Sequence, residues 1–272
     1  MADESLDSVV RNAVAERLAA GEVAVSMTVR LVESVEIAQI ARTCGYDSLY
    51  IDLEHCPMSL RQAGQICVAA LGAGITPFVR VPSHAPEWVS RVLDAGAMGV
   101  IAPHVRSAEE ARAVVAAAKF PPFGHRSVGG GLPQLRFRGY PPVESRRLLN
   151  ERTTVLAMIE GPEGLDRVEE IAAVDGVDIL FIGTNDLCAE LGIGGQFDHP
   201  LVREAYARTI AAARRHGKHV GIGGLAGRPK LLAEFVALGA RYVSAGSDLS
   251  YLMAAAEERC RLVRGFLARP PG

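Results

Sequence analysis

Short runs of apolar and β-branched residues alternate along this chain with longer segments in which apolar residues recur every three to four positions. The first pattern is typical of strands buried on both faces, and the second of helices that bury one face. The predicted strands are Val23–Val29, Ser48–Asp52, Thr76–Val81, Gly99–Val105, Thr154–Glu160, Val177–Gly183, His219–Gly223 and Tyr242–Ala245. The predicted helices are Ser34–Cys44, Ser59–Leu71, Ala85–Ala95, Ser107–Lys119, Glu163–Val174, Pro200–His216, Arg228–Leu238 and Leu249–Phe266, after a helical leader at Leu6–Ala20.

Eight strand–helix units follow one another, which predicts a single α/β domain folded as a (β/α)8 TIM barrel. The chain length of 272 residues suits one such barrel. We expect a leader helix within residues 1–22, the barrel over 23–267, and a disordered tail at 268–272. A doubly wound open sheet remains the alternative, because counting units does not show that the sheet closes.

One segment, residues 121–152, interrupts the alternation. It contains Pro-Pro pairs at 121–122 and 141–142 and three consecutive glycines at 129–131. This density of glycine and proline predicts a long loop and not a helix. Long structured loops in compact domains are usually functional, and since this loop comes after the fourth strand we expect it on the catalytic face of the barrel.

The composition excludes several classes of function. Apolar residues make up 49% of the chain, and its net charge of −2 offers no basic field for nucleic acid or anionic lipid. The start of the chain does not resemble a signal peptide, and the longest apolar run, Ile66–Val79, is too short to span a bilayer. The five cysteines form no CxxC pair, which suits reduced thiols. We therefore expect a soluble, cytoplasmic protein.

Polar side chains stand at the carboxyl ends of several predicted strands. His55 follows the second strand, Arg80 ends the third, Glu160 ends the fifth and Asp186 follows the sixth. Since these ends meet at the mouth of a barrel, we expect the four side chains in one cavity. Two carboxylates without a basic neighbour repel one another unless a proton or a cation bridges them. Glu160 and Asp186 are therefore interpreted as ligands of Mg²⁺ or a similar divalent ion, which needs few protein ligands.

Plainer interpretations of these residues stay open at this point. Either carboxylate could cap the helix that follows it or pair with a surface arginine, and His55 could be a partly buried imidazole beside Glu54. Other chemistries have less support. The histidines lack zinc-site spacing, there is no GxSxG motif or phosphate-binding loop, and none of the three lysines ends a predicted strand, which argues against a Schiff-base aldolase.

Six motifs, in order along residues 20 to 260, resemble the HpcH/HpaI aldolases. These are metal-dependent (class II) pyruvate aldolases with a TIM barrel related to that of phosphoenolpyruvate-using enzymes. The motifs are the segment 46–57 with Ile-Asp-Leu-Glu-His, Pro77-Phe-Val-Arg80, Leu93-Asp-Ala-Gly-Ala97, the segment 120–129 with Pro-Pro-x-Gly-x-Arg-Ser-Val-Gly, Met158-Ile-Glu160 and Phe181-Ile-Gly-Thr-Asn-Asp-Leu187.

The resemblance implies a role for each matching residue. His55 matches the general base and Asp94 an acidic residue that raises its basicity, while Arg80 matches the cation that steadies the substrate's keto or enolate oxygen. Glu160 and Asp186 match ligands of a divalent ion, Mg²⁺, Mn²⁺ or Co²⁺. The residues that match the substrate pocket are Arg80, Met158, Gly183, Thr184 and Asn185, and those that match its mouth are Asp52 and Arg126.

The implied reaction is reversible cleavage of a 4-hydroxy-2-oxo acid to pyruvate, or a related 2-oxo acid, and an aldehyde through a metal-stabilised enolate. The chain departs from well-known members at Met158, where they have Gln, at Thr184-Asn185, where they have Pro-Ala, and at 81–84, where they often have Trp. These changes concern the pocket for the aldehyde. Oxaloacetate decarboxylation or carboligation at the same site, a CoA-ester lyase, and a 2-oxo-acid-binding scaffold remain alternatives.

The resemblance also implies a homo-oligomer. Relatives assemble as hexamers, trimers of dimers, often by exchange of the last helix. Residues Leu249–Leu262 are apolar enough to pack on a neighbouring subunit, although the helix could equally pack on its own barrel. The other partners expected are the small 2-oxo acid and the aldehyde, without nucleic acid or a membrane.

Overall fold

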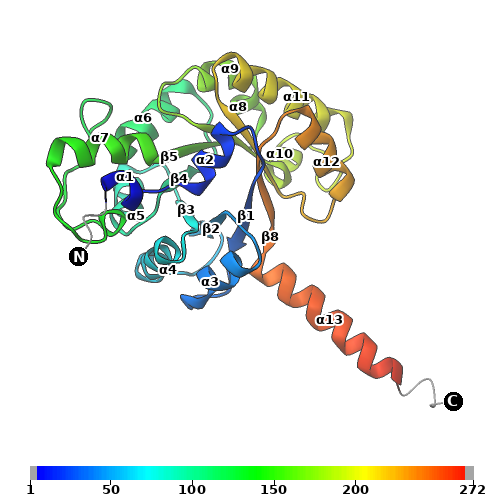
Figure 1. Cartoon of the computed structure of the whole chain (residues 1–272). Helices are drawn as coiled ribbons and strands as arrows, with labels where there is room; N and C mark the ends of the chain where they lie inside the picture. Colours follow the sequence, from blue (N-terminus) through cyan, green and yellow to red (C-terminus); the bar gives the residue numbers. More distant parts are fainter. Residues whose placement is uncertain (1–4, 267–272) are drawn as a thin grey trace.

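The computed structural model describes residues 5–266, in which eight parallel strands close into a barrel (Figure 1). Each strand pairs with the next along the chain, and β8 pairs with β1. The strands are β1 (Ala24–Val29), β2 (Ser48–Asp52), β3 (Thr76–Arg80), β4 (Gly99–Ala102), β5 (Thr154–Ile159), β6 (Ile179–Gly183), β7 (His219–Gly223) and β8 (Tyr242–Ser247). The predicted TIM barrel is confirmed, and the pairing of β1 with β8 excludes an open doubly wound sheet.

Both faces of the barrel wall are buried. In β2, Leu49 and Ile51 pack outward against the surrounding helices, whereas Tyr50 points inward and packs with Phe78 and Phe181. Successive strand residues point to opposite faces, so both sets must be apolar. This is why the strands are continuous apolar runs in the sequence and do not alternate with polar residues.

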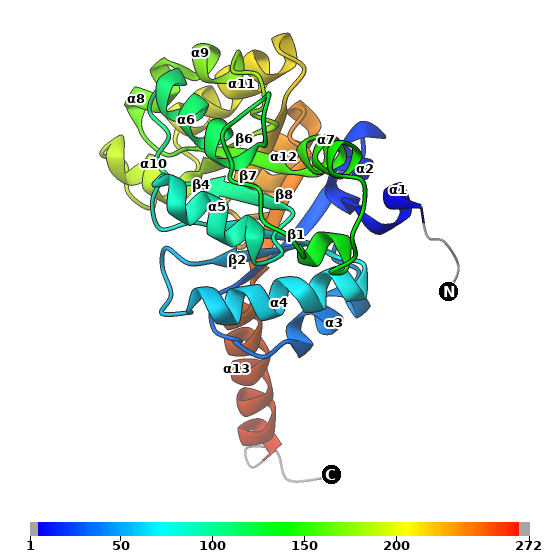
Figure 2. The same cartoon turned by 90° about the vertical axis from the view of Figure 1, so that its left-hand side faces the viewer.

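Helices surround this barrel, and all but the last of them bury apolar side chains in the fold. They are α1 (Leu6–Val9), α2 (Ala13–Ala19), α3 (Glu36–Thr43), α4 (Leu60–Ala73), α5 (Pro86–Asp94), α6 (Ala108–Ala118), α7 (Pro142–Arg152), α8 (Pro162–Asp166), α9 (Val168–Ala172), α10 (Thr184–Glu190), α11 (Pro200–Arg215), α12 (Pro229–Leu238) and α13 (Asp248–Phe266), with a short 3-10 helix, η1 (Pro133–Leu135). Seen from two directions, α13 projects away from the barrel (Figures 1 and 2). None of the helices within residues 5–266 has the length and apolar character needed to cross a membrane.

The predicted leader is two helices and not one. Asn12 separates α1 from α2 because its side chain accepts a hydrogen bond from the Ala15 backbone and so caps α2. The Asn12 amide also donates to Thr154 Oγ1, at the start of β5, and to the Arg152 carbonyl. The leader is thereby fixed at the amino ends of the strands. The expected tail at 268–272 lies outside the described residues.

The expectations for residues 121–152 were wrong in two respects. The segment does not leave the end of β4 directly, because the chain first passes through α6, which returns it to the amino ends of the strands. The segment therefore lies on the face of the barrel opposite to the carboxyl ends. Its second part is helical: Pro142 occupies the first turn of α7, where a proline costs no hydrogen bond.

Candidate active site

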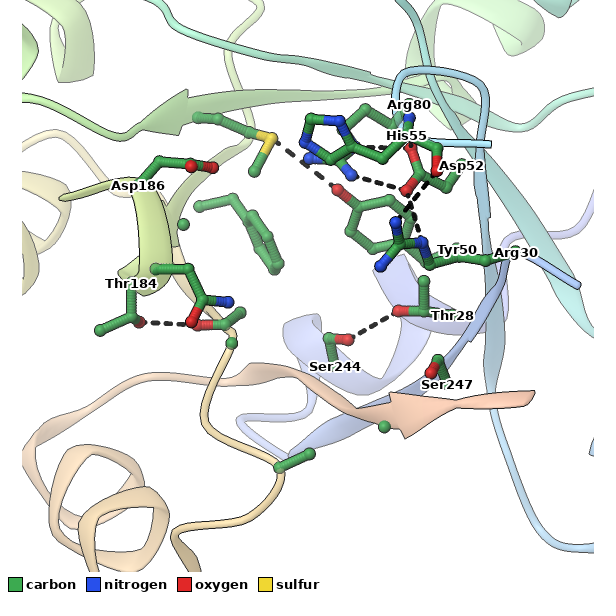
Figure 3. A pocket seen from close by; sticks show the side chains of 18 of the residues that line it. Thr28, Arg30, Tyr50, Asp52, His55, Arg80, Thr184, Asp186, Ser244 and Ser247 are labelled. Atoms are coloured by element: carbon green, nitrogen blue, oxygen red, sulfur yellow. Dashed lines mark hydrogen bonds and ion pairs between the residues drawn. The ribbon is translucent and has the colours of Figure 1, made fainter. Parts of the chain in front are cut away.

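A cavity of about 370 Å³ opens at the carboxyl ends of the strands (Figure 3). Its wall includes side chains or backbone from β1, β2, β3, β5, β6, β7 and β8. The predicted site residues that line it are Asp52, His55, Arg80, Met158, Glu160, Gly183, Thr184, Asn185 and Asp186. The barrel thus brings together residues that are far apart in the sequence, as the strand-end argument predicted.

One side of the cavity is organised by the carboxylate of Asp52, which is fully buried. Arg80 Nε and Nη2 donate to its two oxygens at 2.9 and 2.6 Å, and Arg80 Nη1 forms an ion pair with Glu54 at 2.8 Å. Burial alone would raise the pKa of Asp52, but the hydrogen bonds and charge of Arg80 outweigh it and lower that pKa. The pair therefore stays ionised and fixes the Arg80 guanidinium at the cavity wall.

His55 lies at the rim, in the turn after β2. Its backbone N–H donates to Asp52 Oδ1 at 3.3 Å, and its carbonyl accepts a hydrogen bond from Arg30 Nη2 at 3.0 Å. The imidazole is about half exposed and lies 3.7 Å from Glu54. A half-exposed imidazole held by its backbone can meet a ligand in the cavity and exchange protons with it.

The opposite side of the cavity holds Glu160, directly after β5, and Asp186, in the first turn of α10. Glu160 is buried; its Oε2 accepts a hydrogen bond from the His104 backbone at 2.8 Å, whereas its Oε1 has no partner. Burial raises the pKa of Glu160 to about 7, with a further contribution from the charge of Asp186 and opposing ones from His104 and Arg80. An unpartnered buried carboxylate oxygen beside a second carboxylate fits a cation.

Gly183, the last residue of β6, makes room for this carboxylate. A Cβ added at Gly183 would collide with Glu160 Oε1 and come within 2.8 Å of Glu160 Cγ. The described residues contain no group of three or more His, Cys, Asp or Glu side chains that could hold a metal. The donor set at this point is therefore two carboxylates, which suits an ion that keeps water or substrate as its other ligands.

The other predicted pocket residues stand beside these carboxylates. Met158 accepts a hydrogen bond from the hydroxyl of Tyr50 on its sulfur at 3.8 Å. The Thr184 side chain is buried and donates its one hydroxyl proton to the Gly223 carbonyl, with its oxygen also in contact with the Tyr206 hydroxyl.

The structure does not bring Asp94 or Arg126 to this cavity within one chain. Asp94 ends α5, and its carboxylate accepts a hydrogen bond from Arg126 Nη2 at 2.7 Å. Arg126 is buried in the segment after α6, with its guanidinium over the ring of Phe120. Both residues lie toward the amino ends of the strands, away from the cavity of their own chain, so the role of Arg126 at the mouth stays a prediction. The effect of Asp94 on His55 stays a prediction.

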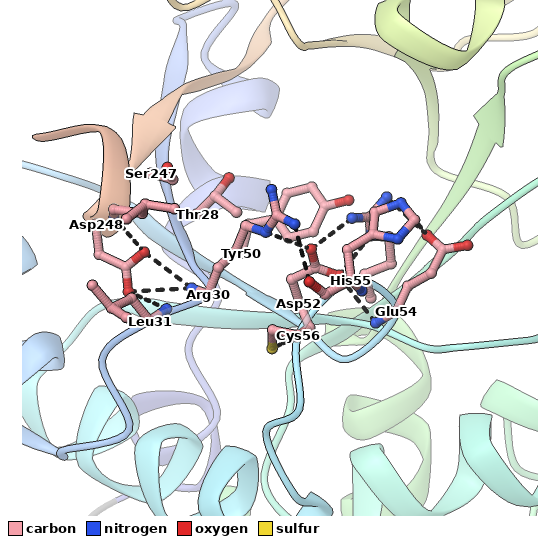
Figure 4. Close-up of polar contacts among 12 residues, drawn as sticks. Thr28, Arg30, Leu31, Tyr50, Asp52, Glu54, His55, Cys56, Ser247 and Asp248 are labelled. Atoms are coloured by element: carbon pink, nitrogen blue, oxygen red, sulfur yellow. Dashed lines mark hydrogen bonds and ion pairs between the residues drawn. The ribbon is translucent and has the colours of Figure 1, made fainter. Parts of the chain in front are cut away.

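Sequence reasoning missed three residues at the site. Arg30 follows β1 and lines the cavity, so the strand-end argument could have found it. His104, which was set aside because it has no metal-site spacing, lies 3.3 Å from both Glu54 and Glu160. Its φ of 51° is a left-handed conformation that is rare outside glycine, and such strain is common at functional sites. Asp248, at the start of α13, had no signal, because its partners are backbone groups after β1 (Figure 4).

Comparison with known proteins gives one consistent family. Residues 26–255 match the model of the HpcH/HpaI aldolase/citrate lyase family. A 4-hydroxy-4-methyl-2-oxoglutarate aldolase of Hapsidospora irregularis is 40% identical over 91% of this chain and 93% of its own length. A 4-hydroxy-2-oxovalerate aldolase of Novosphingobium aromaticivorans is 38% identical over 78% of this chain and 80% of its own. The crystal structure of an HpcH/HpaI aldolase from Desulfitobacterium hafniense, 32% identical, covers 95% of this chain and 97% of its own with a TM-score of 0.88.

Proposed function

Because the chain belongs to the HpcH/HpaI aldolase/citrate lyase family and is an enzyme of the class II aldolase type, we propose that His55, Arg80, Glu160 and Asp186 carry out its reaction. That reaction is the reversible cleavage of a 4-hydroxy-2-oxo acid to pyruvate, or a related 2-oxo acid, and an aldehyde or other carbonyl compound. The observation that supports this assignment best is the cavity itself. Its lining combines an imidazole and a guanidinium at the ends of β2 and β3 with two carboxylates at the ends of β5 and β6.

The family depends on a divalent metal ion, and Glu160 and Asp186 are the residues that would hold it here. The unpartnered Oε1 of Glu160 and the space left by Gly183 support this assignment. We favour Mg²⁺, Mn²⁺ or Co²⁺, since the donors are carboxylate oxygens. Such an ion supplies Lewis-acid charge beside the 2-oxo acid, which favours the enolate form of pyruvate.

The residues of the chain supply the remaining steps. In the cleavage direction His55 takes the proton of the C4 hydroxyl, the C3–C4 bond breaks, and the carbonyl fragment leaves. The protonated His55 then returns a proton to C3 of the enolate, which gives pyruvate. Arg80, fixed by Asp52 and Glu54, donates hydrogen bonds to the oxygen on which negative charge develops. Preorganised donors of this kind contribute about 3–4 kcal/mol to lowering the barrier. Met158, Gly183, Thr184 and Asn185 shape the cavity around the 2-oxo acid.

The projecting helix α13 supports a homo-oligomer, for which we propose the hexamer of relatives. Its apolar side chains Leu252, Met253, Val263 and Phe266 are each more than half exposed. Exposed apolar surface of this extent is typical of an interface and not of a free helix. All five cysteines are unpaired, which is consistent with the reducing conditions of a cytoplasm.

The experiment that tests the function is exchange of the C3 protons of pyruvate in D₂O, followed by NMR. Enolisation needs no knowledge of the second substrate, so it tests the proposed site alone. We expect exchange in chelator-treated protein to require added Mg²⁺, Mn²⁺ or Co²⁺, and to fall by about 10³-fold or more in Glu160→Gln. His55→Ala should lower it by about 10²–10⁴-fold, the usual contribution of a general base. Folded wild-type protein that gives no exchange with any of these metals would contradict the pyruvate-aldolase assignment.

A further inference from the structure

Arg30 is a second guanidinium in the cavity that the proposed chemistry does not use. It directly follows β1, and its guanidinium is turned into the cavity in front of Tyr50 and beside Thr28 (Figure 3). The side chain is 40% exposed, so a ligand in the cavity can reach it. Its backbone is fixed, because the N–H groups of Arg30, Leu31 and Val32 all donate to the carboxylate of Asp248 at 2.8 to 3.2 Å (Figure 4).

The charge of Arg30 is only partly matched by the protein. Its carboxylate partner is Asp52, at 3.4 Å from Nε, and Asp52 already accepts two shorter hydrogen bonds from Arg80. Arg30 Nη2 donates to the neutral carbonyl of His55, and among residues 5–266 no partner is found for Nη1. A guanidinium has five donors and binds a carboxylate best through two of them. Arg30 therefore keeps both charge and donors available to an anionic ligand.

The position of Arg30 suits an anionic group at the end of the substrate that is remote from the 2-oxo acid. Glu160 and Asp186 follow β5 and β6, whereas Arg30 follows β1, and strands four apart in an eight-stranded barrel face one another across its mouth. Ser244 and Ser247, on β8, line the wall on the side of Arg30 and add hydroxyl groups. A molecule whose 2-oxo acid lies against Glu160 and Asp186 thus points its other end toward Arg30.

We propose that Arg30 determines specificity for a carbonyl fragment that itself carries a carboxylate. The substrate in the cleavage direction is then a dicarboxylic 4-hydroxy-2-oxo acid, and the released fragment is an oxo acid and not a neutral aldehyde. This inference rests on the proposed function. Arg30 is not among the residues assigned to metal and pyruvate binding, but it contacts Asp52 and the His55 carbonyl, so its effect on the acceptor must be measured as a ratio in which any effect on enolate formation cancels.

The test runs the reaction in the aldol direction with a matched pair of acceptors. Glyoxylate and glycolaldehyde are both two-carbon aldehydes. Glyoxylate carries a carboxylate where glycolaldehyde carries a hydroxymethyl group. With saturating pyruvate and Mg²⁺, the kcat/KM of each acceptor is measured for wild type, Arg30→Met and Arg30→Lys. The control is Arg112→Met, which makes the same change at an exposed arginine on α6 that does not line this cavity. The readout is the ratio of the two kcat/KM values, which cancels differences in folding and in enolate formation.

We expect Arg30→Met to lower the glyoxylate-to-glycolaldehyde ratio by about 10- to 100-fold, as loss of a charged hydrogen-bonding partner does. Arg30→Lys keeps the charge but not the two-pronged geometry, and should lower the ratio less. Arg112→Met should keep the wild-type ratio. Equal losses with both acceptors in Arg30→Met would show that Arg30 only holds His55 and Asp52 in place, and would overturn the inference, as would an unchanged ratio.

Proton exchange of pyruvate distinguishes a wrong inference about Arg30 from a wrong proposed function. If wild type exchanges the C3 protons but Arg30→Met leaves the ratio unchanged, the inference alone is wrong. If wild type gives no exchange, the assignment of the site to pyruvate fails, and the inference fails with it.

Discussion

At the scale of single residues, Asp52 holds together the side of the cavity that carries positive charge. Both of its oxygens accept hydrogen bonds from Arg80, and the backbone N–H groups of Glu54 and His55 donate to Oδ1. A buried ion pair contributes little net free energy compared with an apolar pair, but removing one member leaves a charge buried without its partner. Asp52 is therefore both a positioning residue and a point where function and stability are coupled.

Asp52→Asn should destabilise the fold by about 3 kcal/mol at neutral pH, because Arg80 loses its buried counter-charge. The pKa of Asp52 is lowered in the folded state, so the ionised carboxylate stabilises the protein above its unfolded-state pKa near 3.8. This stabilisation is lost as pH falls through the folded-state pKa. Urea unfolding of both proteins in steps from pH about 7 down to about 2 measures it. A difference between the two proteins that stays the same down to the lowest of these pH values would contradict the linkage to Asp52.

A substitution at Gly183 tests the proposed metal site without removing a ligand. The added methyl group in Gly183→Ala collides with Glu160, so the carboxylate must move. We expect the affinity for Mn²⁺ to fall by about 10- to 100-fold, as for other changes that disturb the orientation of a ligand. Titration with Mn²⁺ followed by EPR measures this.

Gly72→Ala is the matched control for that substitution. An added Cβ at Gly72 meets nothing within 4 Å, and alanine favours a helix over glycine by about 1 kcal/mol. This variant should therefore bind Mn²⁺ as wild type does. If Gly183→Ala did the same, Glu160 would not be a ligand in the observed position.

At the scale of elements, the turn after β1 and the start of α13 are joined through one side chain. Asp248 is buried and accepts hydrogen bonds from the backbone of Arg30, Leu31 and Val32, and from Leu249 at the start of its own helix. A carboxylate in the first turn of a helix also interacts favourably with the helix dipole. Asp248 thus sets where α13 begins and where Arg30 stands.

Asp248→Ala should destabilise the protein by about 2–4 kcal/mol, because several partly buried N–H groups lose their acceptor. Urea unfolding measures the change. Asp248→Asn keeps one carbonyl oxygen, and we expect it to lose roughly half as much. Equal stability of Asp248→Ala and wild type would mean that water replaces the carboxylate at no cost.

The path of the chain from β4 through α6 explains why the predicted placement of residues 121–152 was wrong. The predicted helix at Ser107–Lys119 was correct to within its ends, and a helix that follows a strand in a barrel returns the chain to the strand's amino end. The proline and glycine content identified the turns correctly but masked α7, where Leu148 and Leu149 face the core. The burial of these two leucines stabilises α7, and local composition does not show which side chains are buried.

At the scale of the whole molecule, α13 is the part that one chain does not bury. The helix leaves the barrel (Figure 2). Asp248 is the one buried residue of α13, and the large apolar side chains of the helix are exposed. Burying a large apolar side chain contributes about 1.5–3 kcal/mol. Several such residues on one helix make its burial against a second copy of the chain favourable, which supports the proposed homo-oligomer.

Leu252→Arg combined with Val263→Arg should therefore shift the protein from an oligomer toward smaller species. The expected change in the association constant is at least about 100-fold, because two buried apolar side chains are lost and two charges are introduced. Light scattering coupled to size-exclusion chromatography gives the mass. Glu257→Gln, on the same helix, is the control and should keep the wild-type mass. An oligomer of unchanged mass in the double variant would exclude α13 from the interface.

The order of strands and helices and the main residues of the cavity could be predicted from the sequence, whereas closure of the sheet rests on the pairing of β8 with β1. Strands buried on both faces must be continuous apolar runs, and the polar residues at their ends, such as His55, Arg80 and Glu160, converge whenever parallel strands close. Tertiary structure alone decided which of these side chains are already paired. Arg80 is held by two carboxylates, Arg30 keeps donors free, and His104 lies between Glu54 and Glu160. Such contacts join residues from different strands, and their distances depend on how the closed barrel orients each side chain, which no local pattern encodes.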